Sequence, residues 1–147
     1  MEFRKINADN VPACVEIFIK TYNQPPWNYQ WTKDDASKYL NEYVSSPQFV
    51  GFAAYEGNDI AGAFFAHSKT WWTNTQLFID ELFVSPQHQK KGLGKQLIKY
   101  AEQYAEENNL QTITLMTHKF MPAMNLYQNI DFIHAQPFVI LFKTVQP

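Results

Sequence analysis

A pair of glycines, Gly92 and Gly94, lies where a hydrophobic strand pattern gives way to a helical one, and it constrains this chain more than any other feature. The chain has only five glycines, and two at this spacing allow a close approach to the backbone. Apolar residues with helical periodicity follow and predict an amphipathic helix that begins near Gly92: Leu93, Leu97, Ile98, Ala101, Tyr104 and Ala105. The first N–H groups of a helix have no intrahelical partner and attract anions. The sequence therefore predicts a phosphate site here.

Positive charge and motif spacing narrow the choice of phosphate ligand. Three lysines suit a pyrophosphate at this place: Lys90, Lys91 and Lys95. A P-loop requires Gly at the position of Gln89 and Ser or Thr at the position of Gln96. The dinucleotide-binding fingerprint requires a third glycine at the position of Leu97. The pattern present is Gln-x-x-Gly-x-Gly, from Gln89 to Gly94, after a strand that ends at Val84. We call residues 89–94 the glycine loop.

Length and composition indicate one globular domain over residues 1–147. Hydrophobic and aromatic contents of 46% and 16% favour a packed core over disorder. The net charge of −2 argues against a nucleic-acid surface, because phosphate backbones are bound through accumulated Lys and Arg. The single cysteine, Cys14, excludes an internal disulfide framework, and no stretch resembles a signal peptide or a membrane span. We expect a cytoplasmic protein without nucleic-acid or membrane partners.

Hydrophobic patterning predicts the element order β-α-α-β-β-β-α-β-α-β-β. Helices are expected to begin near Asp9 or Asn10, after the capping residue Thr32, near Gly92 and near Pro122. Alternating or β-branched runs predict strands at residues 2–6, 49–55, 60–67, 76–84, 112–117, 132–134 and 138–143. The predicted fold class is α/β, of the α+β type.

The glycine loop, together with the strand that precedes it, resembles the coenzyme A loop of the GCN5-related N-acetyltransferase (GNAT) superfamily. The segment from Ala123 to Phe132 is similar to that family's Asn-x-x-Ala-x-x-x-Tyr-x-x-x-Gly-Phe motif. This chain departs from the motif at two positions, with Phe120 in place of Asn and Asp131 in place of Gly, although Asp can adopt a positive φ. The element order is a third resemblance and covers nearly the whole chain.

The resemblance implies a GNAT-like mixed, mostly antiparallel central sheet of about six to seven strands flanked by about four helices. It also implies acetyl-CoA as the acyl donor, with the backbone of Leu82, Phe83 and Val84 paired to the pantetheine amides. Tyr127 is implied as the general acid for the thiolate, the alternative being a Tyr that only packs its helix. Homodimers through strand edges near the C-terminus are a further implication. The pyrophosphate is expected to contact Gln89, Lys90, Lys91, Gly92, Leu93, Gly94 and Lys95.

Two adjacent carboxylates, Asp80 and Glu81, interrupt an otherwise apolar strand. Uncompensated charge there is costly, so at least one of them is expected to face a polar cavity. Consecutive strand side chains point to opposite faces, so only one enters the cleft unless a bulge lies between them. Glu81 is our first choice for a group that accepts the amine proton or attracts a cation, and Asp80 is the second. A solvated pair at a strand end is the alternative.

Aromatic residues supply candidates for a substrate wall. Trp27 and Trp31 lie in a Pro- and aromatic-rich loop, where they either line a substrate site or pack the loop onto the core. Trp72, next to Trp71, lies either at a hairpin tip or in such a wall. Four histidines are scattered without metal-ligand spacing, so no metal site is predicted and surface or packing roles are expected: His67, His88, His118 and His134.

The resulting hypothesis is an N-acetyltransferase that transfers acetyl from acetyl-CoA to a primary amine by direct attack in a ternary complex. The segment from Asp80 to Val84 with the glycine loop resembles GNAT members that acetylate polyamines and aminoglycosides, so a small cationic amine is the preferred substrate. The alternatives are a protein or peptide N-acetyltransferase, and a coenzyme A-binding module without catalysis.

Overall fold

The computed structural model describes residues 1–146, which group into two compact units. The first unit is Met1–Thr117 and the second begins at His118. A single domain over residues 1–147 stays a prediction from the sequence.

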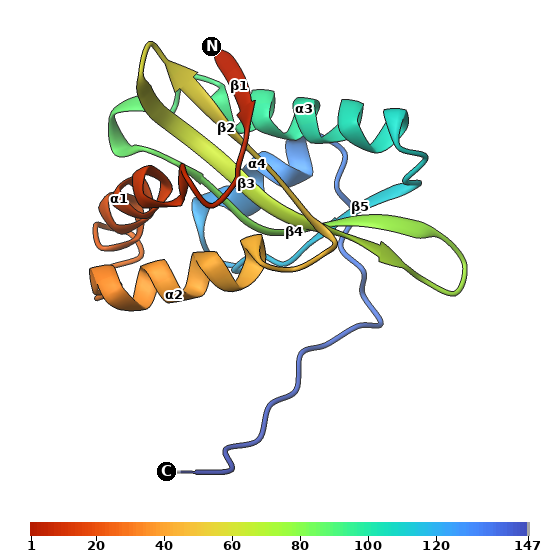
Figure 1. Ribbon diagram of the computed structural model, residues 1–147. Coiled ribbons are helices and arrows are strands. Elements are labelled where there is room, and N and C mark those ends of the chain that lie inside the picture. Colours follow the sequence, from red (N-terminus) through yellow and green to blue (C-terminus); the bar gives the residue numbers. More distant parts are fainter. Residues whose placement is uncertain (147) are drawn as a thin grey trace. The chain divides into compact units, whose positions relative to one another are not determined.

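The first unit is a five-stranded mixed sheet with helices on both faces. The strand order is β1-β2-β3-β4-β5, antiparallel except for the parallel pair β4 and β5. Helices α1 and α2 lie on one face of the sheet and α3 lies on the other (Figure 1). The elements are β1 (Glu2–Lys5), α1 (Val11–Tyr22), α2 (Lys33–Val44), β2 (Phe49–Glu56), β3 (Asp59–Thr70), β4 (Thr75–Val84), the 3-10 turn η1 (Pro86–His88), α3 (Leu93–Glu107) and β5 (Thr112–Leu115).

The helices bury the faces that their sequence periodicity predicts. In α2, the Thr32 side chain accepts a hydrogen bond of 3.1 Å from the Asp35 backbone N–H, which confirms the predicted cap. The predicted apolar stripe of α3 is buried at Leu93, Leu97, Ile98, Ala101 and Ala105. The core between the sheet and α1 and α2 contains Val11, Cys14, Val15, Phe18, Ala36, Leu40, Phe65 and Phe83.

Strand β4 carries two irregularities that define the geometry of the candidate site. Phe65 of β3 pairs with Glu81, and Ala66 pairs with Ile79, so Asp80 is an extra residue in a β-bulge. The parallel pairing with β5 ends at Ile79, opposite Leu115, whereas β4 continues to Val84. The β5-facing edge of residues 80–84 therefore has no strand partner among the described residues.

The second unit contains α4 (Pro122–Asn129), and Asp131 follows it with the positive φ of 72° that the motif comparison anticipated. The strands predicted at 132–134 and 138–143 are not formed in the described residues, which corrects the predicted six to seven strands to five. Aromatic and β-branched composition favours a strand only where a neighbouring strand supplies hydrogen bonds and packing, and these residues have none. Across residues 1–146, no helix combines the length and the apolar character that crossing a bilayer requires.

Candidate active site

The glycine loop leads directly into the N-terminus of α3. Gly92 is the residue before the helix and has a left-handed φ of 83°, which glycine adopts without steric cost. A Cβ added at Gly92 would meet nothing within 4 Å, so the space beside this backbone is open. Within the described chain, no side chain caps this helix end, and Lys90, Lys91 and Lys95 beside it are exposed. The arrangement can hold an anion on backbone amides, as the sequence predicts.

Side chains at the start of the glycine loop and just before it tie the loop to the sheet. The Gln89 amide donates to the Val84 carbonyl oxygen at 3.0 Å. Nδ1 of His88 lies 2.6 Å from Oγ of Ser85, and its Nε2 lies 3.0 Å from Oε2 of Glu56 at the end of β2. This use of His88 was not predicted from the sequence, although its place four residues after the strand end at Val84 indicates a loop contact. These bonds hold the glycine loop in a fixed position against the strand ends.

The stretch of β4 beyond its pairing with β5 offers its backbone more than its side chains. The Phe83 side chain is buried between Phe18 and Phe65, at ring centroid distances of 5.5 and 6.0 Å. Leu93, at the start of α3, is likewise buried, and its side chain would contact a Cβ added at Gly62 of β3. Phe83 and Leu93 can therefore contribute to a ligand site only through main-chain groups, which is the mode predicted for Leu82, Phe83 and Val84.

Glu81 is held by phenols from α1 and α2. Its Oε2 accepts from Tyr22 at 3.1 Å and its Oε1 accepts from Tyr39 at 2.6 Å. The hydroxyl groups of Tyr39 and Tyr43 lie 2.9 Å apart, which extends the network to the next turn of α2. Burial raises the pKa of the Glu81 carboxyl above its usual value, and the hydrogen bonds from Tyr39 and Tyr22 oppose that rise. We call Glu81, Tyr22, Tyr39 and Tyr43 the tyrosine network.

Asp80 faces the same side of the sheet as Glu81, because the bulge breaks the alternation between them. Its Oδ2 lies 2.6 Å from Nδ1 of His67, which is two residues from the buried Phe65 and on the same face of β3. Burial raises the pKa of the Asp80 carboxyl, and the hydrogen bond and charge of His67 oppose the rise. The structure thus brings both predicted carboxylates to the face covered by α1 and α2. It adds His67, which the sequence analysis did not select.

The predicted aromatic residues lie in different environments. Trp31 packs between Phe18 and Tyr39, with 5.1 Å between ring centroids in each case, and Trp27 packs against Tyr22 at 5.5 Å. Trp72 is 92% exposed at the tip of the β3–β4 hairpin. Roles for Trp27, Trp31 and Trp72 in a substrate wall stay predictions.

Tyr127 belongs to the second unit. It lies on α4, and its ring centroid is 5.5 Å from that of Phe132. Its backbone oxygen accepts hydrogen bonds from the N–H groups of Ile130 and Phe132, at 3.2 and 3.0 Å, where the chain turns through Asp131. The residues of its sequence motif therefore contact one another. A role for Tyr127 as general acid stays a prediction.

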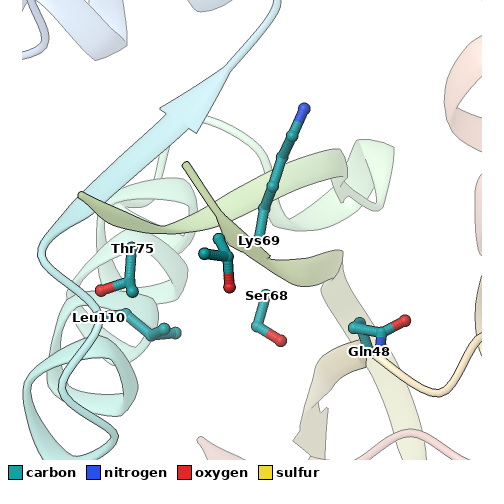
Figure 2. A pocket seen from close by; sticks show the side chains of 6 residues that line it. Gln48, Ser68, Lys69, Thr75 and Leu110 are labelled. Carbon is teal, nitrogen blue, oxygen red and sulfur yellow. The ribbon is translucent and has the colours of Figure 1, made fainter. Parts of the chain in front are cut away.

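A hollow of about 540 Å³ lies beyond the C-terminus of α3, and Figure 2 shows side chains from β3, β4 and the segments around them lining it. The hollow is lined by Gln48, Ser68, Lys69, Thr70, Thr75 and Leu110. None of these is a predicted site residue, so the hollow is separate from the candidate active site. A search of residues 1–146 finds no group of three or more His, Cys, Asp or Glu side chains placed to hold a metal ion.

Comparison with known families assigns the fold and the motifs together. The acetyltransferase (GNAT) family model matches residues 13–132, which include α1, the carboxylates of β4, the glycine loop and the motif of α4. The chain belongs to the acetyltransferase (GNAT) family.

Individual relatives are distant. The chain is 34% identical to streptothricin acetyltransferase from Streptomyces lavendulae over 92 residues, 62% of this chain and 47% of that protein. It is 26% identical over 100 residues to the uncharacterized N-acetyltransferase YsnE from Bacillus subtilis, 66% of this chain and 64% of that protein. The matched regions thus span less than two thirds of the length of these two curated relatives.

Solved structures share the fold. A probable acetyltransferase superposes with a TM-score of 0.80 at 14% identity and covers 100% of this chain and 99% of its own. The aminoglycoside N-acetyltransferase AAC(6')-Iy, in complex with CoA, superposes with a TM-score of 0.76 at 15% identity and covers 99% of this chain and 95% of its own. At these identities the likeness establishes the fold and leaves the acceptor open.

Proposed function

We propose that this protein transfers an acetyl group from acetyl-CoA to the primary amine of a small cationic molecule, by direct attack in a ternary complex. The observation that carries the proposal is that the β-bulge at Asp80 directs two adjacent carboxylates to one face of β4, at the point where β4 and β5 separate. A cationic amine is attracted to that face by charge. Immediately beyond the carboxylates, the same strand continues without a strand partner on its β5 side among the described residues.

The residues present fit acetyl-CoA on four counts. The α3 N-terminus is uncapped by side chains in the described residues, the space at Gly92 is open, three lysines flank it, and residues 80–84 of β4 lie beyond the pairing with β5. The proposed contacts are the amides from Gly92 to Lys95 for the pyrophosphate and the backbone of Leu82 to Val84 for the pantetheine arm. When bound, acetyl-CoA supplies the acetyl group as a reactive thioester.

The chain's own residues then have three tasks. The backbone of β4 orients the donor, the Asp80 and Glu81 face binds the cationic acceptor, and Tyr127 protonates the departing thiolate, a role that rests on the family motif. A phenol is suited to this last step because its reference pKa near 10 is not far above that of a thiol, about 8.5. Trp27 and Trp31 are proposed to border the acceptor site through the aromatic cluster around Tyr22 and Tyr39.

The acceptor class is supported by the relatives as well as by the charge. One curated relative is named streptothricin acetyltransferase, and another aminoglycoside acetyltransferase of the same fold was solved in complex with sisomicin. The latter superposes with a TM-score of 0.74 at 17% identity. Two acidic side chains and a tyrosine network provide the kind of surface that polyamines and aminoglycosides require.

A thiol-release assay tests the proposal. The full chain is mixed with acetyl-CoA and a panel of diamines, polyamines, aminoglycosides and amino-terminal peptides, and free coenzyme A is measured. We expect release with the cationic small amines, reduced in Tyr127→Phe. Release with peptides alone would favour the alternative of a protein or peptide N-acetyltransferase. Coenzyme A binding by calorimetry without turnover on any amine would favour the non-catalytic binding module.

A further inference from the structure

A histidine and an aspartate lie in contact beside Glu81, and neither the family motifs nor the sequence pattern gives the histidine a role. Nδ1 of His67 lies 2.6 Å from Oδ2 of Asp80. The imidazole also stacks on Phe78, with 5.3 Å between ring centroids. The His67 side chain is 33% exposed, whereas that of Asp80 is 11% exposed. The ring is therefore held in position and remains accessible to a solute.

The hydrogen bond determines which ring nitrogen can accept a proton. An aspartate carboxylate accepts hydrogen bonds, so the neutral imidazole that satisfies it carries its hydrogen on Nδ1. Nε2 then presents a lone pair. No hydrogen bond to Nε2 of His67 occurs within residues 1–146. The pair thus has the chemistry of an oriented base with one free acceptor nitrogen.

We propose that His67, oriented by Asp80, accepts the proton that the acceptor amine must lose before it attacks. This inference rests on the proposed function and names the base for the same site. Asp80 acts through His67 and is a positioning residue. Glu81, our first choice from the sequence, becomes the group that supports this site and attracts the cation.

The tyrosine network explains why Glu81 is less suited to be the base. Both Glu81 oxygens already accept hydrogen bonds from phenols, at 3.1 and 2.6 Å. An amine that approached Glu81 would share these oxygens with Tyr22 and Tyr39, each of which is also packed among other aromatic rings. Nε2 of His67 has no such competing hydrogen bond within residues 1–146. Histidine is also the side chain whose ordinary titration lies between pH 5 and 8, where a base for this reaction works best.

The proposed step conserves protons and bonds. One proton of the acceptor ammonium moves to Nε2 of His67 and leaves a neutral amine. The amine nitrogen forms the new N–C bond at the thioester carbon, the C–S bond breaks, and the sulfur leaves as a thiolate. The nitrogen loses its second proton as the amide forms, the thiolate gains one, and the imidazolium returns its proton to water. The net products are the amide, a free thiol and one released proton.

Several ionisable groups surround the His67 ring and contribute to the pH dependence of the site. Asp80 and Glu81 come from β4, and Tyr39 and Tyr43 come from α2. Both carboxylates raise the pKa of Tyr43, after the larger effect of its own burial, so α2 is within electrostatic range of the pair. The phenols are neutral through the physiological range, which leaves the two carboxylates as the charged groups beside the imidazole.

The tautomer of His67 gives a test that needs no substrate. Nitrogen-15 NMR of the full chain, assigned with a His67→Gln variant, reports which ring nitrogen carries hydrogen in the neutral imidazole. We expect the hydrogen on Nδ1 in the parent protein, and a shift of the tautomer population toward Nε2 in Asp80→Asn. Hydrogen on Nε2 in the parent protein would overturn the proposal.

Kinetics with the best acceptor from the amine panel give the second test. We expect kcat/KM to fall roughly 100-fold or more in His67→Ala, the usual scale for loss of an acid–base group. Added imidazole is expected to restore part of the lost rate in His67→Ala and to leave the parent rate unchanged. His67→Gln is expected to lose the acidic limb of the pH profile between about pH 5 and 8. His134→Ala, at an exposed histidine of the second unit, is the matched control and is expected to equal the parent.

The outcomes separate this inference from the proposed function. If the parent turns over and His67→Ala has the same kcat/KM and pH profile as the parent, the role of His67 is overturned and acetyl transfer stays intact. Absence of thiol release from the parent with every amine overturns both. Coenzyme A affinity, measured by calorimetry, is expected to be equal in His67→Ala and the parent. A coenzyme A affinity that fell in parallel with the rate would identify a structural effect and overturn the catalytic role.

Discussion

Tyr39 donates a hydrogen bond of 2.6 Å to Oε1 of Glu81 across 42 positions of sequence, and so links α2 to the central strand β4. Burial, followed by the negative charge of Glu81, raises the pKa of the Tyr39 phenol far above its usual value. The Tyr39 phenol therefore stays protonated at neutral pH and remains a hydrogen-bond donor to Glu81.

Tyr39→Phe removes this donor and leaves one oxygen of a largely buried carboxylate without its partner. We expect the free energy of unfolding to fall by about 1.5–3 kcal/mol, the usual cost of losing a hydrogen bond to a charged group. Urea denaturation at neutral pH measures the change. Tyr29→Phe, which alters an exposed phenol outside the tyrosine network, is the matched control and is expected to stay within about 0.5 kcal/mol of the parent. Equal losses in the two variants would contradict a special role for the Tyr39 bond.

Glu81 is expected to make the protein less stable as the pH rises above 4.5. Burial raises its pKa from that ordinary value, so the folded chain holds the proton more tightly than the unfolded chain does. The free energy of unfolding then falls as pH increases from the unfolded pKa through the folded one. Asp80 has a raised pKa of the same sign, so the parent carries both contributions.

Glu81→Gln isolates the Glu81 contribution to this pH dependence. We expect the free energy of unfolding of the variant, relative to the parent, to increase with pH above 4.5 until Glu81 is ionised in the folded parent. Denaturation curves taken in steps between about pH 4.5 and 8 measure that difference. A difference that stays constant over the range would show that the pKa of Glu81 is the same in the folded and unfolded chains.

Gly92→Ala tests whether the start of α3 binds the acyl carrier. The positive φ of 83° makes any side chain at this position costly by about 1–2 kcal/mol, so the loop is expected to shift. We expect coenzyme A affinity to fall by about tenfold or more, because the amides of the first helical turn lose their alignment. Calorimetric titration with coenzyme A measures it.

Gly57→Ala is the matched control for Gly92. Gly57 has a φ of 64° in the β2–β3 turn, and a Cβ there also meets nothing within 4 Å. The two substitutions thus impose a similar backbone cost at different places. Unchanged affinity in Gly57→Ala and reduced affinity in Gly92→Ala is the expected pair of results. A similar loss in both would assign the effect to general destabilisation.

Gly62→Ala tests the contact between β3 and α3. A Cβ at this position would lie 2.9 Å from the Phe83 carbonyl oxygen and 3.3 Å from Cδ1 of Leu97, so the strand or the helix must move. We expect a loss of about 1–3 kcal/mol in the free energy of unfolding, the usual cost of overpacking a core. Thermal and urea unfolding measure it. A stability equal to that of the parent would show that α3 packs less closely on the sheet than the structure indicates.

Cys14 is predicted to be unreactive in the folded protein. It is fully buried in α1, and burial raises the pKa of its thiol to about 12, so little thiolate forms at neutral pH. We expect an aromatic disulfide reagent to label it only slowly in buffer and rapidly in denaturant. Rapid labelling of the folded chain would mean that α1 opens readily. Cys14 belongs to the core cluster between the sheet and α1 and α2.

Features that depend only on residues close together in the sequence were predictable. The glycine loop, the start of α3 and the Thr32 cap each depend on residues within a few positions of one another, and the structure confirms the loop–helix junction and the cap. The positive φ of Asp131 follows from the same kind of local turn chemistry.

Features that depend on distant partners were not predictable in the same way. The segment from Phe138 to Lys143 has strand-like composition, but a strand needs a neighbour, and none is present in the described residues. His67 was not predicted as a site residue because its partner, Asp80, is 13 residues away across a hairpin. Pairing the runs around residues 60–67 and 76–84 about the tip would have put His67 opposite Phe78, one residue pair from Asp80.

The bulge at Asp80 makes the length of β4 as important as its composition. Deletion of Asp80 would restore the regular alternation between Ile79 and Glu81, keep the apolar side chains of the strand on their faces, and leave one carboxylate in place of two. Such a shortened strand is expected to attract cations more weakly. Register, as well as residue identity, therefore decides which side chains of β4 share a face.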